Sequence, residues 1–226
     1  LFPITHYKDI YKYDAKKLRD INTLYNNYLE LKKKESNNRD MKVLYISGPS
    51  GVGKTTLAKI FASQTYSNDE IFISSSSNDI LDGYLGEKSI ILDDLRDDAL
   101  KYADLLKFLD NNTNSSVKSR YSNKQLVRCE LVIITSIKEP YQLYTNVGED
   151  KKQLYRRIKE YLVITKNVND YILVSYLYDD ASNQYKLNQQ VNVTKLINDY
   201  FAKYQQQIFK SITDTLIENG LAVKVK

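Results

Sequence analysis

The sequence predicts an α/β fold in which a parallel sheet is flanked by helices. Short apolar runs recur through the middle of the chain, at residues 43–46, 71–73, 90–92 and 131–134. Apolar residues at helical spacing fill the segments between several of these runs, and alternating strands and helices are typical of parallel sheets. Residues 48–55 read GPSGVGKT, a full match to the phosphate-binding pattern G-x-x-x-x-G-K-[ST], which joins a strand to a helix.

We expect three parts: an N-terminal helical segment over 1–40, the α/β core over 41–165, and a C-terminal strand and long-helix extension over 166–226. The apolar runs are too short to span a membrane, and the first residues lack a signal-peptide core, so we expect a cytoplasmic protein. The net charge of +5 permits a polyanionic partner without requiring one. His6 is the only histidine and Cys129 the only cysteine, which excludes cysteine-clustered zinc sites and most histidine-based sites.

The first element is an amphipathic helix from Asp14 to Lys34, where apolar residues recur at spacings of three and four. Residues 36–40 then form a polar linker. Such a helix can pack on its own domain or against neighbouring subunits, and the pattern is compatible with both.

The phosphate-binding loop follows the strand at residues 43–46. Its glycines allow backbone N–H groups to point at an anion beside the positive end of the next helix. Lys54 is expected to reach the β and γ phosphates of ATP, and the Thr55 hydroxyl to bind Mg²⁺. The expected nucleotide-binding residues are Gly48, Pro49, Ser50, Gly51, Val52, Gly53, Lys54, Thr55 and Thr56.

A second functional segment is SIILDD at residues 89–94, a buried strand that ends in two carboxylates. This arrangement is typical of a Walker B segment. Asp93 is expected to hold Mg²⁺ and Asp94 to orient the attacking water. The alternative is a helix N-cap, a role that Asp97 or Asp98 could fill instead.

Residues 115–124 read SSVKSRYSNK and predict a hairpin with one basic face. Cations that meet phosphates and a ring that stacks on bases suit single-stranded DNA. The candidate DNA-binding residues are Lys118, Arg120, Tyr121 and Lys124. A solvated strand face is the equal alternative.

A further apolar strand at 131–134 ends at Thr135-Ser136, whose hydroxyls could sense the γ-phosphate or the water. Arg156 and Arg157 then lie on a predicted helix, and arginine can stabilise phosphoryl-transfer charge, sometimes from a neighbouring subunit. A solvent-exposed pair is the alternative. Strands are expected at 161–165 and 171–178, and a long helix at 194–218 that ends before Gly220.

Taken together, five segments resemble the superfamily 3 helicase domain of rolling-circle replication initiator (Rep) proteins, those of bacterial plasmids related to the Rep proteins of small circular single-stranded DNA viruses. In order, they are GPSGVGKT, LDGYLGEKSIILDD, VKSRYSNK, LVIITS and QLYRRI, within residues 41–165. The resemblance implies a small AAA+ type domain in which the strand of the third motif lies between those of the first two. It also implies a bacterial cytoplasmic protein with ATP and Mg²⁺ as cofactors.

The same resemblance implies a hexameric ring whose hairpins line a central channel, with the helical segment before the loop helping to hold the ring. It places QLYRRI, with Arg156 and Arg157, at the ring interface. The family's third motif usually ends in an Asn that contacts the γ-phosphate, but here Ile137 follows Thr135-Ser136. An apolar side chain cannot make that contact, so Ser136 or Thr135 is left for the role.

The family's nuclease module needs a histidine pair, which a chain with His6 alone cannot contain. We therefore expect the ATPase part of a longer initiator, with the nuclease module N-terminal to it. An AAA+ loader or remodeller of another replication protein would share Lys54, Asp93 and Asp94 without needing the basic hairpin. A small-molecule kinase or a nucleotide-gated DNA-binding module would also carry the phosphate-binding loop.

Overall fold

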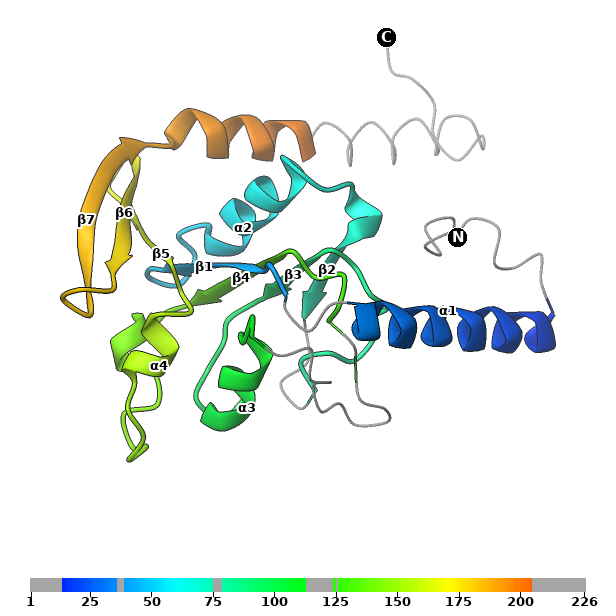
Figure 1. Ribbon diagram of the computed structural model, residues 1–226. Helices are drawn as coiled ribbons and strands as arrows, with labels where there is room; N and C mark the ends of the chain where they lie inside the picture. Colours follow the sequence, from blue (N-terminus) through cyan, green and yellow to red (C-terminus); the bar gives the residue numbers. More distant parts are fainter. Residues whose placement is uncertain (1–13, 36–38, 75–78, 113–123, 125, 205–226) are drawn as a thin grey trace, which may run out of the picture.

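The strands form one seven-stranded sheet in the order β2-β3-β4-β1-β5-β6-β7 (Figure 1). The computed structural model describes residues 14–35, 39–74, 79–112, 124 and 126–204. Neighbouring strands from β2 to β5 pair in parallel, whereas β6 and β7 are added antiparallel at one edge. The strands are β1 Lys42–Ser47, β2 Ile71–Ser74, β3 Ser89–Leu92, β4 Leu131–Ser136, β5 Glu160–Lys166, β6 Tyr171–Asp179 and β7 Gln184–Asn192.

Helices cover both faces of this sheet (Figure 1). The helix α2 and a helix over residues 194–204 lie on one face, and α3 and α4 lie on the other. Among the described residues, no helix has the length and apolar character needed to cross a lipid bilayer. The helical elements are α1 Ala15–Glu35, α2 Lys54–Ser63, α3 Tyr102–Phe108, α4 Lys152–Tyr155 and the 3₁₀ turns η2 Asn68–Glu70 and η3 Pro140–Gln142.

The predicted α/β class and the expected strand order are confirmed. The strand β4 lies between β1 and β3, with Ser47 opposite Ser136 and Leu92 opposite Ile134. The carboxyl ends of parallel strands meet at one edge of the sheet, so this register brings the residues after Ser47, Leu92 and Ile134 together. The expected phosphate loop, acids and hydroxyls therefore share one edge.

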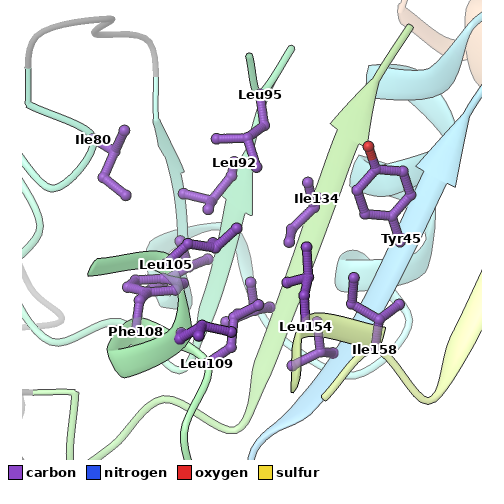
Figure 2. Close-up of a cluster of buried hydrophobic side chains, with 14 of the residues drawn as sticks. Tyr45, Ile80, Leu92, Leu95, Leu105, Phe108, Leu109, Ile134, Leu154 and Ile158 are labelled. Carbon is purple, nitrogen blue, oxygen red and sulfur yellow. The ribbon is translucent and has the colours of Figure 1, made fainter. Parts of the chain in front are cut away.

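Two apolar clusters hold the helices to the sheet. Because side chains alternate along a strand, Tyr45 packs in the cluster under α3 and α4, and Ile46 packs in the cluster under α2. Figure 2 shows the first cluster, in which Leu105 and Phe108 of α3 lie beside Leu92 of β3. Burying side chains of this size contributes about 1.5–3 kcal/mol each. Cys129 is buried in the same cluster.

The N-terminal helix α1 projects from the rest of the chain in Figure 1. It is attached through Tyr25, whose hydroxyl accepts a hydrogen bond of 3.1 Å from Arg128, and through the buried Leu29. Leu24 and Leu31 remain 68% and 60% exposed. The helix thus packs on its own domain with part of its apolar side and leaves the rest accessible.

Some elements differ from the sequence prediction. The strand β7 was missed because most of Gln184–Asn192 is polar and exposed. It is held by backbone pairing to β6 and by Tyr185, which packs against the core. The helix α4 is shorter than expected and ends at Tyr155, so Arg156 and Arg157 follow it. The helix predicted for 194–218 is present over 194–204, and the rest of that prediction lies outside the described residues.

Candidate functional site

The loop from Gly48 to Thr55 joins β1 to α2 and has the geometry of an anion cradle. Gly53 caps α2 with φ 95°, a left-handed conformation that favours glycine, and among the residues that the structure describes no side chain caps the first N–H groups of this helix. A Cβ added to Gly48 would overlap the carbonyl oxygen of Ile164 in β5. The backbone therefore requires glycine at both positions and leaves the positive end of α2 open toward a phosphate.

Lys54 is the first residue of α2, and its side chain folds back over the loop. Its Nζ donates to the carbonyl oxygens of Gly48 at 2.9 Å and Pro49 at 2.8 Å. Burial lowers the pKa of Lys54, while the nearby Asp94 and Asp93 oppose that effect. Lys54 is the only charged residue of the loop. Its Nζ lies where the oxygens of a bound phosphate could replace the two carbonyl oxygens as hydrogen-bond acceptors.

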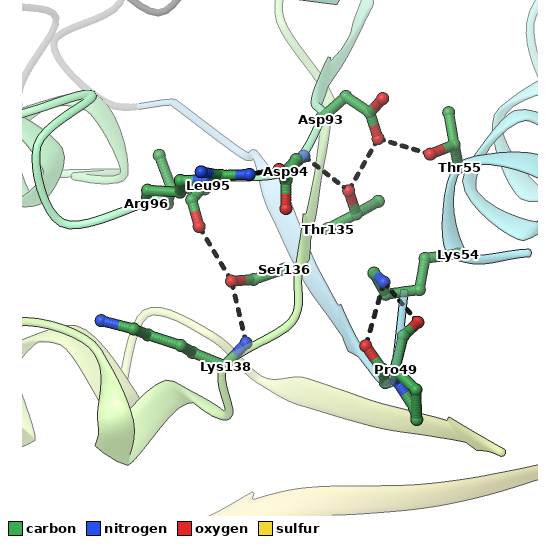
Figure 3. Close-up of polar contacts among 11 residues, drawn as sticks. Pro49, Lys54, Thr55, Asp93, Asp94, Leu95, Arg96, Thr135, Ser136 and Lys138 are labelled. Atoms are coloured by element: carbon green, nitrogen blue, oxygen red, sulfur yellow. Dashed lines mark hydrogen bonds and ion pairs between the residues drawn. The ribbon is translucent and has the colours of Figure 1, made fainter. Parts of the chain in front are cut away.

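Asp93 lies at the centre of a hydrogen-bonded junction at the sheet edge (Figure 3). Its Oδ1 accepts from the Thr55 hydroxyl at 2.6 Å and from the Thr135 hydroxyl at 2.8 Å. Mg²⁺ prefers oxygen ligands and is usually bound by one or two side chains together with substrate phosphates. The adjoining hydroxyl of Thr55 and carboxylate of Asp93, next to the open loop, fit such an ion.

Asp94 follows directly but faces elsewhere. It has φ 51°, a strained conformation for a residue other than glycine, and its N–H donates to the Thr135 hydroxyl at 2.9 Å. Its carboxylate accepts from both Nε and Nη2 of Arg96, at 3.1 and 2.7 Å. Both side chains are largely exposed. The structure therefore places the two acids side by side and gives them different partners.

Thr135 and Ser136 alternate across β4, so they have different environments. Thr135 reaches Asp93, whereas the Ser136 hydroxyl donates to the Leu95 carbonyl at 2.8 Å and accepts from the Lys138 N–H at 3.2 Å. Of the two candidates for the residue facing the nucleotide, the structure brings Thr135 to the site. Ser136, the other candidate, is held on the other side of the strand.

The arginines lie at the opposite edge of the sheet. They precede β5, whose first residue, Glu160, pairs with Leu44 near the start of β1. Arg157 donates to the Gln153 carbonyl at 2.6 Å and lies 3.9 Å from Asp110. Its pKa is lowered by burial, and Asp110 counteracts this. Both arginines line a cavity of about 750 Å³, so the fold does not bring them to the loop of their own chain.

Most of the candidate DNA-binding hairpin lies outside the described residues, including Lys118, Arg120 and Tyr121. Lys124 is described, and its Nζ donates to the Tyr84 carbonyl at 3.0 Å. This contact ties the end of the hairpin segment to the stretch that leads into β3.

Sequence reasoning missed two groups that support the loop. The Tyr161 hydroxyl lies 2.7 Å from the Ser47 hydroxyl, directly before Gly48. Ile197, in the helix over 194–204, is fully buried and lies 4.0 Å from the position of a Cβ on Gly53. No local pattern could have found these contacts, because each joins residues more than a hundred positions apart.

Comparisons with known proteins give two sequence relationships and one structural likeness. Residues 44–138 match the family described as RNA helicase. The chain is 45% identical over 180 residues to a replication protein of Onion yellows phytoplasma (strain OY-M), covering 77% of this chain and 44% of that protein. It thus spans less than half the length of this relative. The N-terminal domain of zonular occludens toxin from Neisseria meningitidis matches with a TM-score of 0.31 and 13% identity, over 69% of this chain and 97% of that domain.

The helicase match begins inside β1 and ends just after β4. It therefore includes the phosphate loop, Asp93, Asp94 and Thr135, the residues that meet at the carboxyl edge of the sheet. The match to the replication protein extends well beyond that region. Together, these two similarities relate the core of the chain to helicase domains and most of the chain to a replication protein.

Proposed function

We propose that this chain is the ATP-hydrolysing motor of a replication initiator. It assembles into a ring, most simply a hexamer, moves on single-stranded DNA and unwinds duplex during rolling-circle replication. The single observation that supports ATP hydrolysis best is the junction at Asp93, where Thr55 and Thr135 share one carboxylate oxygen beside Lys54. The nuclease module of such an initiator would belong to another part of a longer protein.

In this proposal the loop residues Gly48 to Thr56 bind the phosphates, and Lys54 exchanges its two carbonyl partners for β and γ phosphate oxygens. Thr55 and Asp93 would hold Mg²⁺, which when bound neutralises charge that develops on the phosphates. Asp94 leaves Arg96 to orient the attacking water. Thr135 fixes Asp93 and senses the γ-phosphate, while Ser136 supports the strand.

The arginines act on the nucleotide of the adjacent subunit. Their position at the far edge of the sheet supports action in trans, because a rigid domain cannot carry them to its own loop. Arg157 is engaged by Gln153 and Asp110, whereas Arg156 is exposed. We therefore assign the arginine finger to Arg156 and a supporting role to Arg157.

The DNA contacts are assigned to Lys118, Arg120, Tyr121 and Lys124 in the basic hairpin. Replacing the three cations with Ala should weaken binding of a single-stranded oligonucleotide. Each lost phosphate contact should lower the logarithmic salt slope by about 0.7. Lys124 should contribute least, since one of its donors already binds the Tyr84 carbonyl. Unchanged affinity and slope would remove the hairpin from the DNA interface.

The deciding experiment combines sedimentation with strand displacement. The chain is sedimented with and without ATP and a single-stranded oligonucleotide, and the same samples are tested for ATP-dependent unwinding of a tailed duplex. A ring that unwinds the duplex supports the proposal. A ring that hydrolyses ATP without unwinding would favour a loader of another replication protein, and a monomer that hydrolyses ATP would contradict both.

A further inference from the structure

Tyr185, in the C-terminal strand β7, reaches the segment that carries the arginines. Its hydroxyl lies 3.2 Å from the carbonyl oxygen of Tyr155 and 3.1 Å from that of Ile158. These two residues flank Arg156 and Arg157 directly. A single O–H proton is therefore shared between the backbone positions before and after the arginine pair.

The arginine segment, residues 155–158, is held locally by the backbone hydrogen bonds of a single turn. The helix α4 spans only four residues, and helices this short are unstable without tertiary contacts. A helix end also leaves carbonyl groups without partners inside the helix. Leu154 and Ile158 are buried in the core. The Tyr155 carbonyl accepts from the Ile158 N–H at 3.0 Å, and Tyr185 adds a side-chain donor to this carbonyl and to that of Ile158. The two arginines lie between these fixed points.

Tyr185 also belongs to a cluster of tyrosine rings that extends back to the phosphate loop. Its ring centroid lies 5.5 Å from that of Tyr161, whose hydroxyl contacts Ser47 immediately before Gly48. On the other side, its ring lies 6.2 Å from that of Tyr155. Burial and the neighbouring Tyr178 and Tyr155 raise the pKa of Tyr185 well above its usual range, so the hydroxyl keeps its proton and remains a donor.

We propose that Tyr185 is a positioning residue that holds Arg156 in the orientation needed to enter the nucleotide site of the adjacent subunit. This rests on the proposed function, in which Arg156 acts in trans. A misplacement of about 1 Å at a reacting centre can lower the rate about a hundredfold. The C-terminal extension, which lies outside the helicase family match at 44–138, would thus complete the neighbour's active site.

The test uses Tyr185→Phe, which keeps the ring and removes the hydroxyl. Tyr178→Phe is the matched control, because Tyr178 lies in the same ring cluster but bonds to Asn183 in its own hairpin. We expect Tyr185→Phe to lower the turnover number about ten- to a hundredfold with ATP affinity unchanged, and Tyr178→Phe to change the turnover number less than about twofold.

Mixing subunits separates a positioning role from a general structural one. A Lys54→Ala subunit cannot use its own ATP but still offers Arg156, so it should restore activity to Tyr185→Phe subunits. An Arg156→Ala subunit offers no arginine, so mixing it with Tyr185→Phe should restore nothing. In addition, hydrogen exchange of the backbone around residues 156–158 should be faster in Tyr185→Phe than in Tyr178→Phe.

The reference mixture is Lys54→Ala with Arg156→Ala. If this pair regains activity, Arg156 acts in trans, and the result for Tyr185→Phe then decides the inference. Wild-type turnover in Tyr185→Phe, or no rescue by Lys54→Ala, would overturn it. If the reference pair stays inactive although its subunits exchange, the trans arginine itself is refuted, and a positioning role toward the neighbour falls with it.

Discussion

The two edges of the parallel sheet are built in different ways. At the carboxyl edge, the loop after Ser47, Asp93 after β3 and Thr135 at the end of β4 are brought together by strand register. At the amino edge, Arg157 lies 3.9 Å from Asp110, each just beyond the end of a short helix, and the arginine segment is anchored by Tyr185 from β7. The proposed phosphate site lies at one edge, within a single chain, whereas the other edge presents cations far from that chain's own loop.

This difference predicts which subunit a mutation should affect. Changes at the carboxyl edge should affect the subunit that carries them, because the site is contained in one chain. Changes at the amino edge should affect the neighbour, provided that the chain assembles as proposed. Variants at the two edges test this division, beginning with the largest expected effect.

Lys54→Ala should abolish ATP hydrolysis, because it removes the only cation that the loop aims at the phosphates. The measurement is steady-state phosphate release. Lys59→Ala, on the same helix and outside the loop, is the control and should retain turnover. Substantial hydrolysis by Lys54→Ala would mean that the carboxyl edge is not the catalytic site.

Arg156→Ala should lower turnover by about 10³- to 10⁵-fold while ATP binding is largely retained, as expected for an arginine finger. Arg157→Ala should instead destabilise the chain by about 1 kcal/mol, since it removes the contacts with Gln153 and Asp110. Turnover, nucleotide binding and thermal unfolding of both variants distinguish these effects. If instead Arg157→Ala lost turnover and Arg156→Ala lost stability, Arg157 would be the arginine finger and Arg156 the supporting residue.

Thr135→Val should reduce turnover about ten- to a hundredfold, because Asp93 loses a hydrogen bond that fixes its carboxylate next to Thr55. Ser136→Ala should keep most of the turnover and lower stability by about 1–3 kcal/mol, since it leaves the Leu95 carbonyl without this donor. Kinetics and chemical denaturation of the two variants provide the test. If both variants lost turnover to the same extent, the position of Thr135 and Ser136 on opposite faces of β4 would not explain their roles in turnover.

The smallest effect is expected at Cys129, which is tested by chemical labelling of the chain without any substitution. It is buried at the amino edge, just before β4, and burial raises the pKa of its thiol to about 12, although Arg39 partly opposes this. A thiol with that pKa is deprotonated to only about one part in 10⁴ at pH 8, and the thiolate is the reactive form. Maleimide labelling at about pH 8 should therefore be very slow in the folded chain and fast in denaturant. Rapid labelling of the folded chain would show that this edge is loosely packed.

Local sequence determined the carboxyl edge almost completely. The run GPSGVGKT needs glycine where Gly48 approaches Ile164 and where Gly53 caps α2, so the pattern already contains the geometry. The apolar run before Asp93 and Asp94 likewise predicts a buried strand that delivers two acids to the same edge. The hydrophobic pattern was also sufficient for α1, because its apolar residues repeat within one helix.

The tertiary structure alone decided the features that join distant segments. The choice of Thr135 over Ser136 depends on which face of β4 meets Asp93, and strand pairing sets that face. The strand β7 has only a weak hydrophobic pattern of its own and is held by backbone pairing with β6 and by packing of Tyr185. Tyr185 reaches the arginine segment, and Ile197 the phosphate loop, only because the extension folds back onto the core. A local sequence pattern reflects backbone geometry within a few residues. The contacts of Thr135, β7, Tyr185 and Ile197 depend instead on packing between segments that are far apart in the sequence.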